Sequence, residues 1–420
     1  MNQRTRNSVS RGLIYVFPAL IDILVVQIGF VNAIRLAKMG ASASVVGGVA
    51  AVWGFIYMVT CLVVSRIASP ANATRMMIWS CATLTVLCWL FTVVDGIVWM
   101  YILCASVGAT TAFFFPPFQI FMKAVDSAGS RPITSSAGLY TFSWSMGFAI
   151  GPFVAGFLME TGTATSTGLE TSGWKWVYAV SGAAAIATVI GLRMLAHLTH
   201  TARTNERVAS GHQASSPPFD YSQMPDLAWL AWIVCGTGVV VFTIVRAVFP
   251  VRAVSELHLS DSTQGTILFL MGLTQALTAA ALCLSRLWMY RPAAVGAFGI
   301  VGIIATLLYG FGTSQNVLCC AGALFGVYSG ALFVYLVVHA LAHPVKSSHY
   351  VAINESIVGL MGIIGSVFGG LLADHFGFSF ACTAGAMAIL MATLFQVATH
   401  RRNPPVPANS RRHQKGNAHE

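Results

Sequence analysis

Long runs of apolar residues, separated by short polar breaks, repeat along the whole 420-residue chain. A helix needs about 20 mostly apolar residues to cross the hydrocarbon core of a membrane. Twelve runs reach that length, so the pattern predicts an all-α integral membrane protein with twelve transmembrane helices. The predicted spans are residues 12–34, 44–66, 75–94, 97–122, 135–158, 176–198, 227–249, 263–285, 293–312, 317–341, 351–373 and 378–399.

The longest polar interruption, residues 200–226, is rich in Ser, Pro, Asn and His and has no apolar period, which is typical of a flexible loop. It divides the chain into two predicted six-helix bundles, residues 1–199 and 227–399, followed by a disordered tail at 400–420. The first apolar run is longer than the apolar core of a signal peptide, which has about 7–15 residues. We therefore interpret it as an uncleaved first helix.

Composition supports a membrane protein, since 56% of the residues are hydrophobic and only 9% are charged, against about 25% charged in soluble domains. Of the 23 Lys and Arg residues, 18 fall in the terminal segments and in the loops on their side of the membrane. Positively charged loops face the cytoplasm. We therefore expect a multi-pass membrane protein with both termini in the cytoplasm. The formal charge of +10 then needs no nucleic-acid partner.

The two predicted halves carry the same short patterns in the same order, about 214–220 residues apart. In each half, a Ser-Arg pair follows the second span of that half. The fifth span of each half carries an Ile-Gly pair followed by small residues, and an acid closes it. Matched positions are Ser65 and Ser285, Gly151 and Gly365, and Glu160 and Asp374. A parallel repeat of six plus six helices is an architecture of secondary transporters, with the substrate site between the halves.

Three motifs resemble those of one family. The first is a small-residue stripe in the fifth span, formed by Gly138, Gly147, Gly151, Pro152 and Gly156. Small residues allow helix backbones to approach closely in lipid. The second is an aromatic-Pro-Pro segment at residues 115–117. The third is the loop after the second span, in which Arg66 is present but Ser69 stands where the family has an acid.

On these motifs, residues 10–400 resemble the major facilitator superfamily. The aromatic-Pro-Pro segment is similar to that of many bacterial members, so the resemblance implies a bacterial cell membrane. The resemblance implies two six-helix bundles around a central cavity, lined by spans 1, 4, 7 and 10 and flanked by spans 2, 5, 8 and 11. It also implies alternating access by rocking of the bundles. The missing acid at Ser69 removes the charge of the family's inner latch, and Ala155 replaces a glycine of its antiporter motif.

Ionisable side chains within a span are functional candidates, because burying one at mid-membrane costs about 2.5–3.5 kcal/mol. Asp22 lies near mid-depth of the first span on a face with Asn32. It could exchange a proton at a cavity wall or bond to a neighbouring helix. Arg246 could bind an anionic solute or extend to the membrane surface. Their difference in helical height argues against direct contact between the two.

Polar residues of the tenth and eleventh spans form a second group of candidates. Tyr328, Tyr335 and His339 share one helix face, which fits either a ligand-binding wall or a packed aromatic seam. Asn354 and Glu355 lie at the depth of His339. A His–Glu pair there could act as an inner gate or proton relay near neutral pH, and a polar helix end wetted by the cytoplasm is the alternative.

The predicted substrate-binding residues are Asn32, Gln119, Trp144, Arg246, Gln275, Tyr328, Tyr335 and Asn354, and those for proton coupling or gating are Asp22, His339 and Glu355. The nine Cys residues lie within or at the ends of spans without metal-ligand spacing, so we interpret them as packing residues. The chain has no phosphate loop, HExxH motif or nucleophile elbow. We therefore predict no enzyme activity, no metal and no cofactor.

The sequence predicts a gradient-driven or facilitative transporter of a small solute, a symporter or antiporter that can be coupled to protons or another ion. We expect it to act as a monomer in the lipid bilayer. Uptake of a polar or anionic metabolite and export of a hydrophobic compound both remain open. A receptor or assembly factor that keeps the fold without transport is the alternative from another class, and an intramembrane enzyme lacks a supporting motif.

Overall fold

The computed structural model of the protein describes residues 12–127, 133–164, 173–209, 226–284, 288, 291–342 and 347–402. These ranges contain twelve helical segments long and apolar enough to cross a membrane, which confirms the predicted fold class. The elements are α2 (Val16–Lys38), α3 (Ala43–Ile67), α4 (Ala73–Val93), α5 (Ile97–Ala112), α6 (Phe115–Ser127), α7 (Ile133–Ala164), α8 (Gly173–Ala209), α9 (Ala228–Thr243), the π-helix η2 (Ile244–Val248), α10 (Phe249–Ser255), α11 (Asp261–Leu284), α12 (Pro292–Phe311), α13 (Gln315–Ala342), α14 (Ser347–Phe376) and α15 (Phe378–Arg402).

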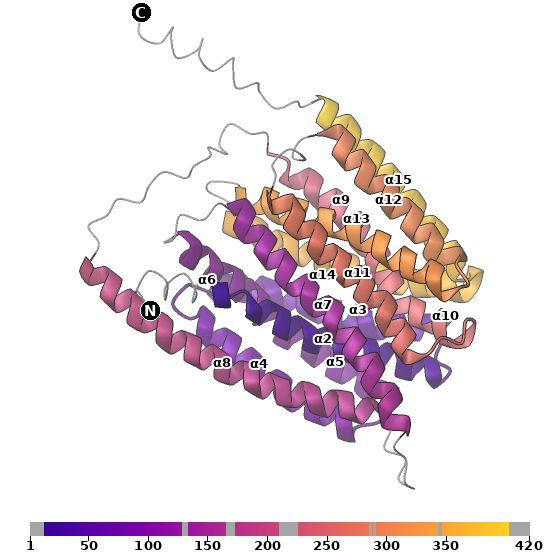
Figure 1. The fold of residues 1–420 in the computed structure, drawn as a ribbon, viewed down its shortest axis with the longest axis horizontal. Helices are drawn as coiled ribbons and strands as arrows, with labels where there is room; N and C mark the ends of the chain where they lie inside the picture. Colours follow the sequence, from indigo (N-terminus) through magenta and orange to yellow (C-terminus); the bar gives the residue numbers. More distant parts are fainter. Residues whose placement is uncertain are drawn as a thin grey trace, which may run out of the picture.

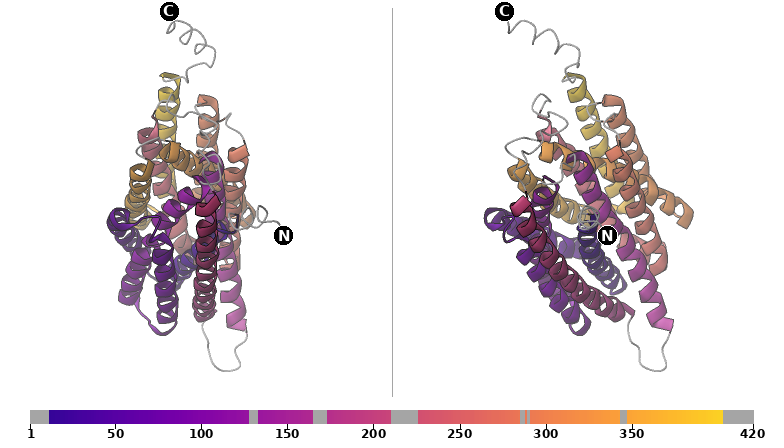
Figure 2. Two further views of the ribbon diagram at one scale, coloured as in Figure 1. Left: turned by 90° about the vertical axis from the view of Figure 1, so that its left-hand side faces the viewer. Right: turned by 60° about the vertical axis from the view of Figure 1, so that its left-hand side comes forward.

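The helices of the first half of the chain gather on one side of the molecule and those of the second half on the other (Figures 1 and 2). Within the first half, α2 packs on α7 and α4 on α8, and within the second half α11 packs on α13 and α12 on α15. Below, the end of the bundle that carries Val16 and Arg402 is called the termini end. The end that carries Lys38 and Ala43 is called the far end.

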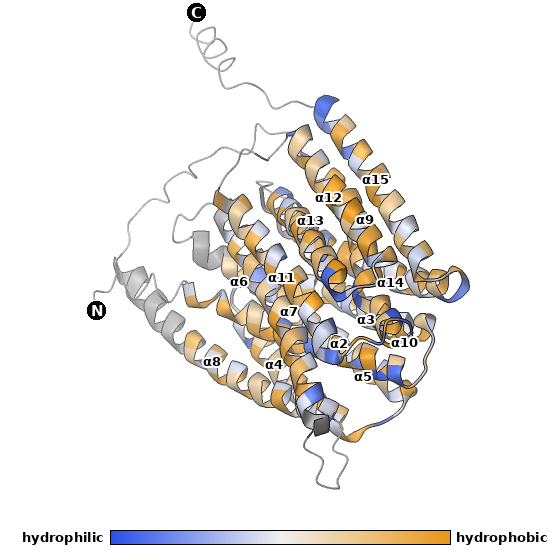
Figure 3. Cartoon of the chain, turned by 45° about the vertical axis from the view of Figure 1, so that its right-hand side comes forward, coloured by the Kyte–Doolittle hydropathy of each residue, from blue (hydrophilic) through white to orange (hydrophobic). Residues whose placement is uncertain are grey.

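Apolar residues cover most of each helix, and polar residues gather at helix ends and connections (Figure 3). Large apolar side chains such as Trp79, Val93 and Leu284 are exposed on the outside. An outer surface of this kind would be unfavourable in water, and it fits a lipid environment. The polar side chains that matter for a pathway therefore have to be sought between the helices.

The two halves meet along two seams, α7 with α11 and α3 with α14. A side chain at Gly47 or Gly265 would collide with a backbone carbonyl of the opposite half, that of Ser366 or of Pro152. Gly156 approaches the Asp261 carbonyl in the same way. Gly370, the matched residue in the second half, approaches the carbonyl of Ala43. The repeated small residues therefore form equivalent contacts at both seams, as expected for close helix packing in a membrane.

Two of the spans are interrupted where proline removes a backbone donor. The fourth span turns at residues 113–114, just before Pro116 and Pro117, and continues as α6. The seventh span passes through η2, because Pro250 has no N–H to donate to the carbonyl of Arg246, four residues earlier. The irregular turn places Arg246 within the π-helix at the centre of the protein.

Helix boundaries differ from prediction mainly at the ends. The first span begins at Val16 rather than at residue 12. Helix α8 continues to Ala209, so the first part of the predicted flexible connection is helical. Helices can extend beyond the apolar stretch because their backbone hydrogen bonds are internal to the segment. The rest of that connection, 210–225, and the tail after Arg402 lie outside the described residues.

Candidate substrate cavity

A cavity lies between the two halves and is lined by side chains from both. Its volume is about 150 Å³, enough for roughly five to ten waters. The helices that line it include α2, α3, α6 and α7 of the first half and α9, η2, α13 and α14 of the second. We call this space the termini-side chamber, because it extends from Arg246 toward Asn354 and Glu355.

A second space, the far-side chamber, continues from Arg246 toward the far end, with a volume of about 100 Å³. Residues that line both chambers mark the boundary between them. They are Val25, Trp53, Thr243, Arg246 and Gly362. The two chambers therefore adjoin each other between the halves, with Arg246 and Trp53 at the level where they meet.

The Arg246 guanidinium has no hydrogen bond and no ion pair among the residues that the structure describes. Its Nη2 lies 3.5 Å from the position that a Cβ at Gly29 would take, so the absence of a side chain there makes room for the cation. The guanidinium carbon lies 5.5 Å from the ring centre of Phe148. A guanidinium whose five donors have no hydrogen-bond partner among the described residues can accept a ligand anion.

The Asp22 carboxylate faces the same chamber from α2. Its Oδ2 is buried and accepts no hydrogen bond from any described residue. It interacts electrostatically with Arg246, but Gly29, beside the guanidinium, lies two helical turns or about 10 Å further along α2. Asp22 and Arg246 are therefore separated in height, as expected from the sequence, with room between them. Both residues line the same cavity.

Trp53 is a cavity residue that the sequence analysis did not single out. Its indole Nε1 is buried without a hydrogen-bond partner among the described residues. Its ring stacks on Tyr57, with ring centres 5.2 Å apart and planes at 6°. Trp53 and Tyr57 lie four residues apart on one face of α3, and that spacing is the signal that could have identified them. In an apolar span, such a pair is easily taken for ordinary packing.

Aromatic rings form one wall of the termini-side chamber. Trp144 meets Phe333 edge to face at 4.9 Å, and Phe242 contacts both Phe333 at 5.9 Å and Phe148 at 5.3 Å. All four line the chamber. The rings come from α7, α9 and α13, so this wall also joins the two halves. Its geometry favours a solute with an apolar surface.

Glu355 joins the two halves at the termini side of the chamber. Its carboxylate oxygens accept hydrogen bonds from Tyr57 Oη at 2.5 Å and from Gln119 Nε2 at 2.6 Å, and Gln119 also donates to Tyr140 Oη at 3.2 Å. These partners come from the first half. The predicted His339–Glu355 pair does not form, because the carboxylate turns toward α3 and α6 and the His339 ring lies 4.4 Å from that of Tyr335.

Asn354 and Asn32 line the two chambers, but their amides are already hydrogen-bonded to protein groups. Asn354 Oδ1 accepts from Trp232 Nε1 at 2.7 Å. Asn32 Oδ1 accepts from Tyr178 Oη at 2.5 Å, and its Nδ2 donates to Cys104 Sγ at 3.2 Å. These amides shape the walls, and fewer of their donors and acceptors are open to a solute.

Other predicted site residues lie away from the cavity. Tyr328 and Tyr335 line a small separate space within the second half, and the Tyr335 hydroxyl lies 3.1 Å from His400 Nε2. Gln275 is fully buried, donates to Ser145 and accepts from Ser329. The cavity is instead lined by the other face of α13, which carries Phe333, Leu336 and Val337. The aromatic-seam alternative therefore describes the Tyr328 face.

The predicted packing glycines lie where α7 crosses its neighbours. A side chain at Gly147 would collide with the Ala19 carbonyl of α2, and one at Gly151 would lie 2.8 Å from the Ile23 carbonyl oxygen. Pro152 and Gly156 touch α11, as described above. Gly138 is buried near the termini end of α7. This stripe holds α7 against α2, on which Asp22 lies.

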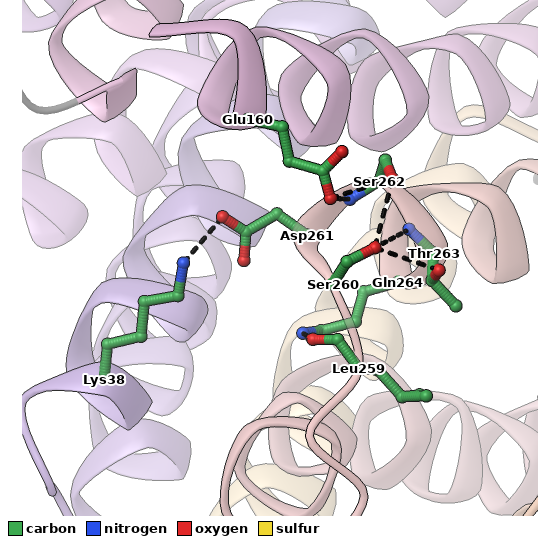
Figure 4. A network of polar contacts seen from close by, with 8 residues as sticks. All are labelled: Lys38, Glu160, Leu259, Ser260, Asp261, Ser262, Thr263 and Gln264. Carbon is green, nitrogen blue, oxygen red and sulfur yellow. Dashed lines mark hydrogen bonds and ion pairs between the residues drawn. The ribbon is translucent and has the colours of Figure 1, made fainter. Parts of the chain in front are cut away.

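At the far end, polar side chains tie the halves together (Figure 4). Lys38 forms an ion pair with Asp261 at 2.6 Å, and Glu160 Oε1 accepts hydrogen bonds from the Ser262 backbone N–H at 3.1 Å and hydroxyl at 2.9 Å. At the other seam, Asp374 accepts from the backbone N–H groups of Ala43 at 2.8 Å and Ser44 at 2.9 Å. Each acid thus caps the N-terminus of a helix in the opposite half.

Comparisons with known proteins agree with this architecture. The model of the Major Facilitator Superfamily matches residues 10–340. A bacterial homologue of the human lysosomal transporter Spinster, inward-facing and unoccupied, is similar with a TM-score of 0.64 and 13% identity over 96% of this chain and 98% of that one. The same homologue in its occupied state gives a TM-score of 0.62 with the same identity and coverage.

The human organic anion transporter MFSD10 has a TM-score of 0.61 and 13% identity over 92% of this chain and 99% of its own. No curated protein matches the chain. At these identities the structures show the fold alone, and the family match carries the assignment. The chain belongs to the Major Facilitator Superfamily and has the twelve-helix fold of a membrane transporter.

Proposed function

We propose that the protein is a secondary transporter that moves a small polar or anionic solute by alternating access, driven by a gradient. The observation that carries the proposal is the cavity between the halves, in which Asp22 and Arg246 have no hydrogen bond or ion pair among the described residues. Buried polar groups are normally satisfied within the protein. Groups left without partners in a cavity between two bundles are suited to bind a ligand and to couple its movement to protons.

We place the termini end in the cytoplasm on the strength of the 18 Lys and Arg residues on that side. The far-end contacts of Glu160, Asp374 and Lys38 then close the path from outside. Glu355, bonded to Tyr57 and Gln119 across the halves, forms the inner closure. Opening one set of contacts while keeping the other gives the solute access to one side at a time.

Asp22 is proposed as the proton-linked residue. Ionised Asp22 is attracted by Arg246, as a bound anion would be. The negative charges of Asp22 and of an anionic solute therefore repel each other. Protonation of Asp22 removes that opposition, and solute and proton then move together. Glu355 is the second candidate, since its release from Tyr57 and Gln119 is needed for the inner closure to open. That human MFSD10 is an organic anion transporter agrees with the proposed charge of the solute.

The test is transport of a labelled solute library into proteoliposomes, with and without a pH gradient. We expect at least one anionic compound to be accumulated by the wild type under an inward proton gradient. The Asp22→Asn variant should lose gradient-driven accumulation but retain exchange of internal for external solute. Tyr328→Phe is a matched control, since Tyr328 lies away from the cavity. Saturable binding without flux would indicate a receptor, and unchanged coupling in both Asp22→Asn and Glu355→Gln would refute the proton proposal.

A further inference from the structure

The groups without partners at the middle level of the cavity are both hydrogen-bond donors. Arg246, from the second half, and Trp53, from the first, line both chambers. Neither the guanidinium nor the indole Nε1 bonds to a described residue. The Thr243 hydroxyl, the other polar side chain at this level, is occupied by the backbone carbonyls of Val239 and Val240. The level therefore offers donors and a positive charge, which complement an anion.

The surroundings of these donors differ on their two sides. Toward the termini end lies the aromatic wall of Trp144, Phe148, Phe242 and Phe333. Phe242 is four residues before Arg246 in the seventh span, and the Phe148 ring lies directly beside the guanidinium. A ligand whose anionic group reaches Arg246 from this chamber must lay its remaining atoms along the rings.

The other polar groups of the chamber do not favour a highly hydroxylated solute. Gln119 and Glu355 bond to each other, Tyr57 donates to Glu355, and Asn354 bonds to Trp232. A sugar would need several open donors and acceptors, and a polar ligand left without partners in such a site loses affinity. An organic cation could pair with Asp22 in the same chamber, but it would lie close to the Arg246 charge and leave both donors of the middle level without an acceptor.

We propose that the solute is a small aryl carboxylate, an organic acid with a flat apolar body. Its carboxylate receives hydrogen bonds from the Arg246 guanidinium and the Trp53 indole N–H, and its body packs on the aromatic wall. This inference rests on the proposed function and specifies its substrate class. Because the two donors belong to opposite halves, one carboxylate bridges them at the middle of the cavity.

Equilibrium binding to the full chain in lipid nanodiscs tests this class with matched probes. The probes are 3-phenylpropionate, its neutral amide, which keeps the shape, and propionate, which keeps the charge but lacks the ring. We expect 3-phenylpropionate to bind at least tenfold more tightly than either of the others. The amide tests the contribution of charge, and propionate tests that of the aromatic wall.

Variants assign the two donors. Arg246→Gln should abolish the preference for the carboxylate over the amide. Trp53→Phe keeps a ring but removes the N–H, and it should weaken 3-phenylpropionate binding about tenfold with a smaller effect on the amide. Thermal unfolding and size-exclusion profiles equal to wild type show that a variant is folded, and Tyr328→Phe should bind as wild type does.

Three results would overturn the proposal: equal binding of carboxylate and amide, a preference for the carboxylate that survives Arg246→Gln, or no binding of 3-phenylpropionate to folded wild type. Binding requires no flux, so the two proposals can fail separately. Carboxylate binding without transport would refute the proposed function and leave this inference standing. Transport of a sugar or a cation in place of an aryl carboxylate would refute this inference and leave transport itself standing.

Discussion

The central cavity and the far-end contacts place the same kinds of residue in opposite situations. In the cavity, the Asp22 carboxylate accepts no hydrogen bond and Arg246 has no ion pair among the residues described. At the far end, Glu160 and Asp374 each accept two hydrogen bonds at a helix N-terminus of the opposite half, and Lys38 pairs with an acid. Both regions lie between the halves, yet Asp22 and Arg246 in the cavity lack the protein partners that the far-end charges have.

The difference supports the proposal that Asp22 and Arg246 act on a ligand, whereas the far-end charges hold the two halves together. Glu160 closes the seam between α7 and α11, and Asp374 closes the seam between α3 and α14. These contacts lie near the surface and are each of modest strength, so the seams can open and re-form. Asp22 and Arg246 are partly buried in a cavity at the middle of the protein, where a charge without a partner costs more than at the surface. A bound solute that satisfies Arg246 and Trp53 therefore changes the energy of the closed state more than any single far-end contact.

The largest effect is expected from removing the cavity cation. Arg246→Gln should reduce transport of an anionic solute at least a hundredfold, because the charge-assisted bidentate contact is lost. Arg246→Lys should retain part of the activity, since it keeps the charge without the planar fork. Initial uptake rates in proteoliposomes measure both. Equal uptake rates for Arg246→Gln and wild type would show that the solute does not bind at Arg246.

A side chain forced into a seam should act on folding instead. Gly47→Val brings a branched side chain against the Ser366 carbonyl, and overpacking of this kind costs about 1–3 kcal/mol. Gly296→Ala is the matched control, since its Cβ would lie at an ordinary 3.6 Å from Val397. Thermal unfolding in detergent should show a clearly lower midpoint for Gly47→Val alone. Equal midpoints would contradict close packing of α3 on α14.

Neutralising the far-end caps should have smaller, local effects of about 1 kcal/mol each. Glu160→Gln should accelerate amide hydrogen exchange at the start of α11, and Asp374→Asn at the start of α3. Exchange followed by mass spectrometry separates the two seams within one protein. Each variant serves as the control for the other, and an identical exchange pattern in both would argue against two separate caps.

The smallest effect is expected on the Tyr328 face of α13. Tyr328→Phe should change solute binding and transport less than twofold, because this face packs within the second half. Binding isotherms and uptake rates check this. A tenfold loss would mean that α13 turns its other face to the solute in another state.

The sequence predicts the twelve spans and the repeat well, because apolar length and the spacing of small residues are direct signals. Glu160 and Asp374 appear in it as matched acids, but only the structure shows that each crosses to the opposite half. The cost of burial identifies Asp22 and Arg246 as candidates. The orientation of α13 was harder to predict, because its polar face with Tyr328 and Tyr335 packs within the second half, and its apolar face lines the cavity. Trp53 was missed because an aromatic residue in an apolar span is easily taken for packing.

The solute anion is proposed to bind the groups without partners at the middle of the cavity, Arg246 and Trp53. The Gly29→Cys variant carries a thiol beside the Arg246 guanidinium. The rate at which a small methanethiosulfonate modifies this thiol reports on access to the site, after the signal of the wild type is subtracted. Saturating 3-phenylpropionate should slow modification at least tenfold, and the same concentration of its amide should not. An unchanged rate while 3-phenylpropionate is bound would place the anion elsewhere and contradict the claim.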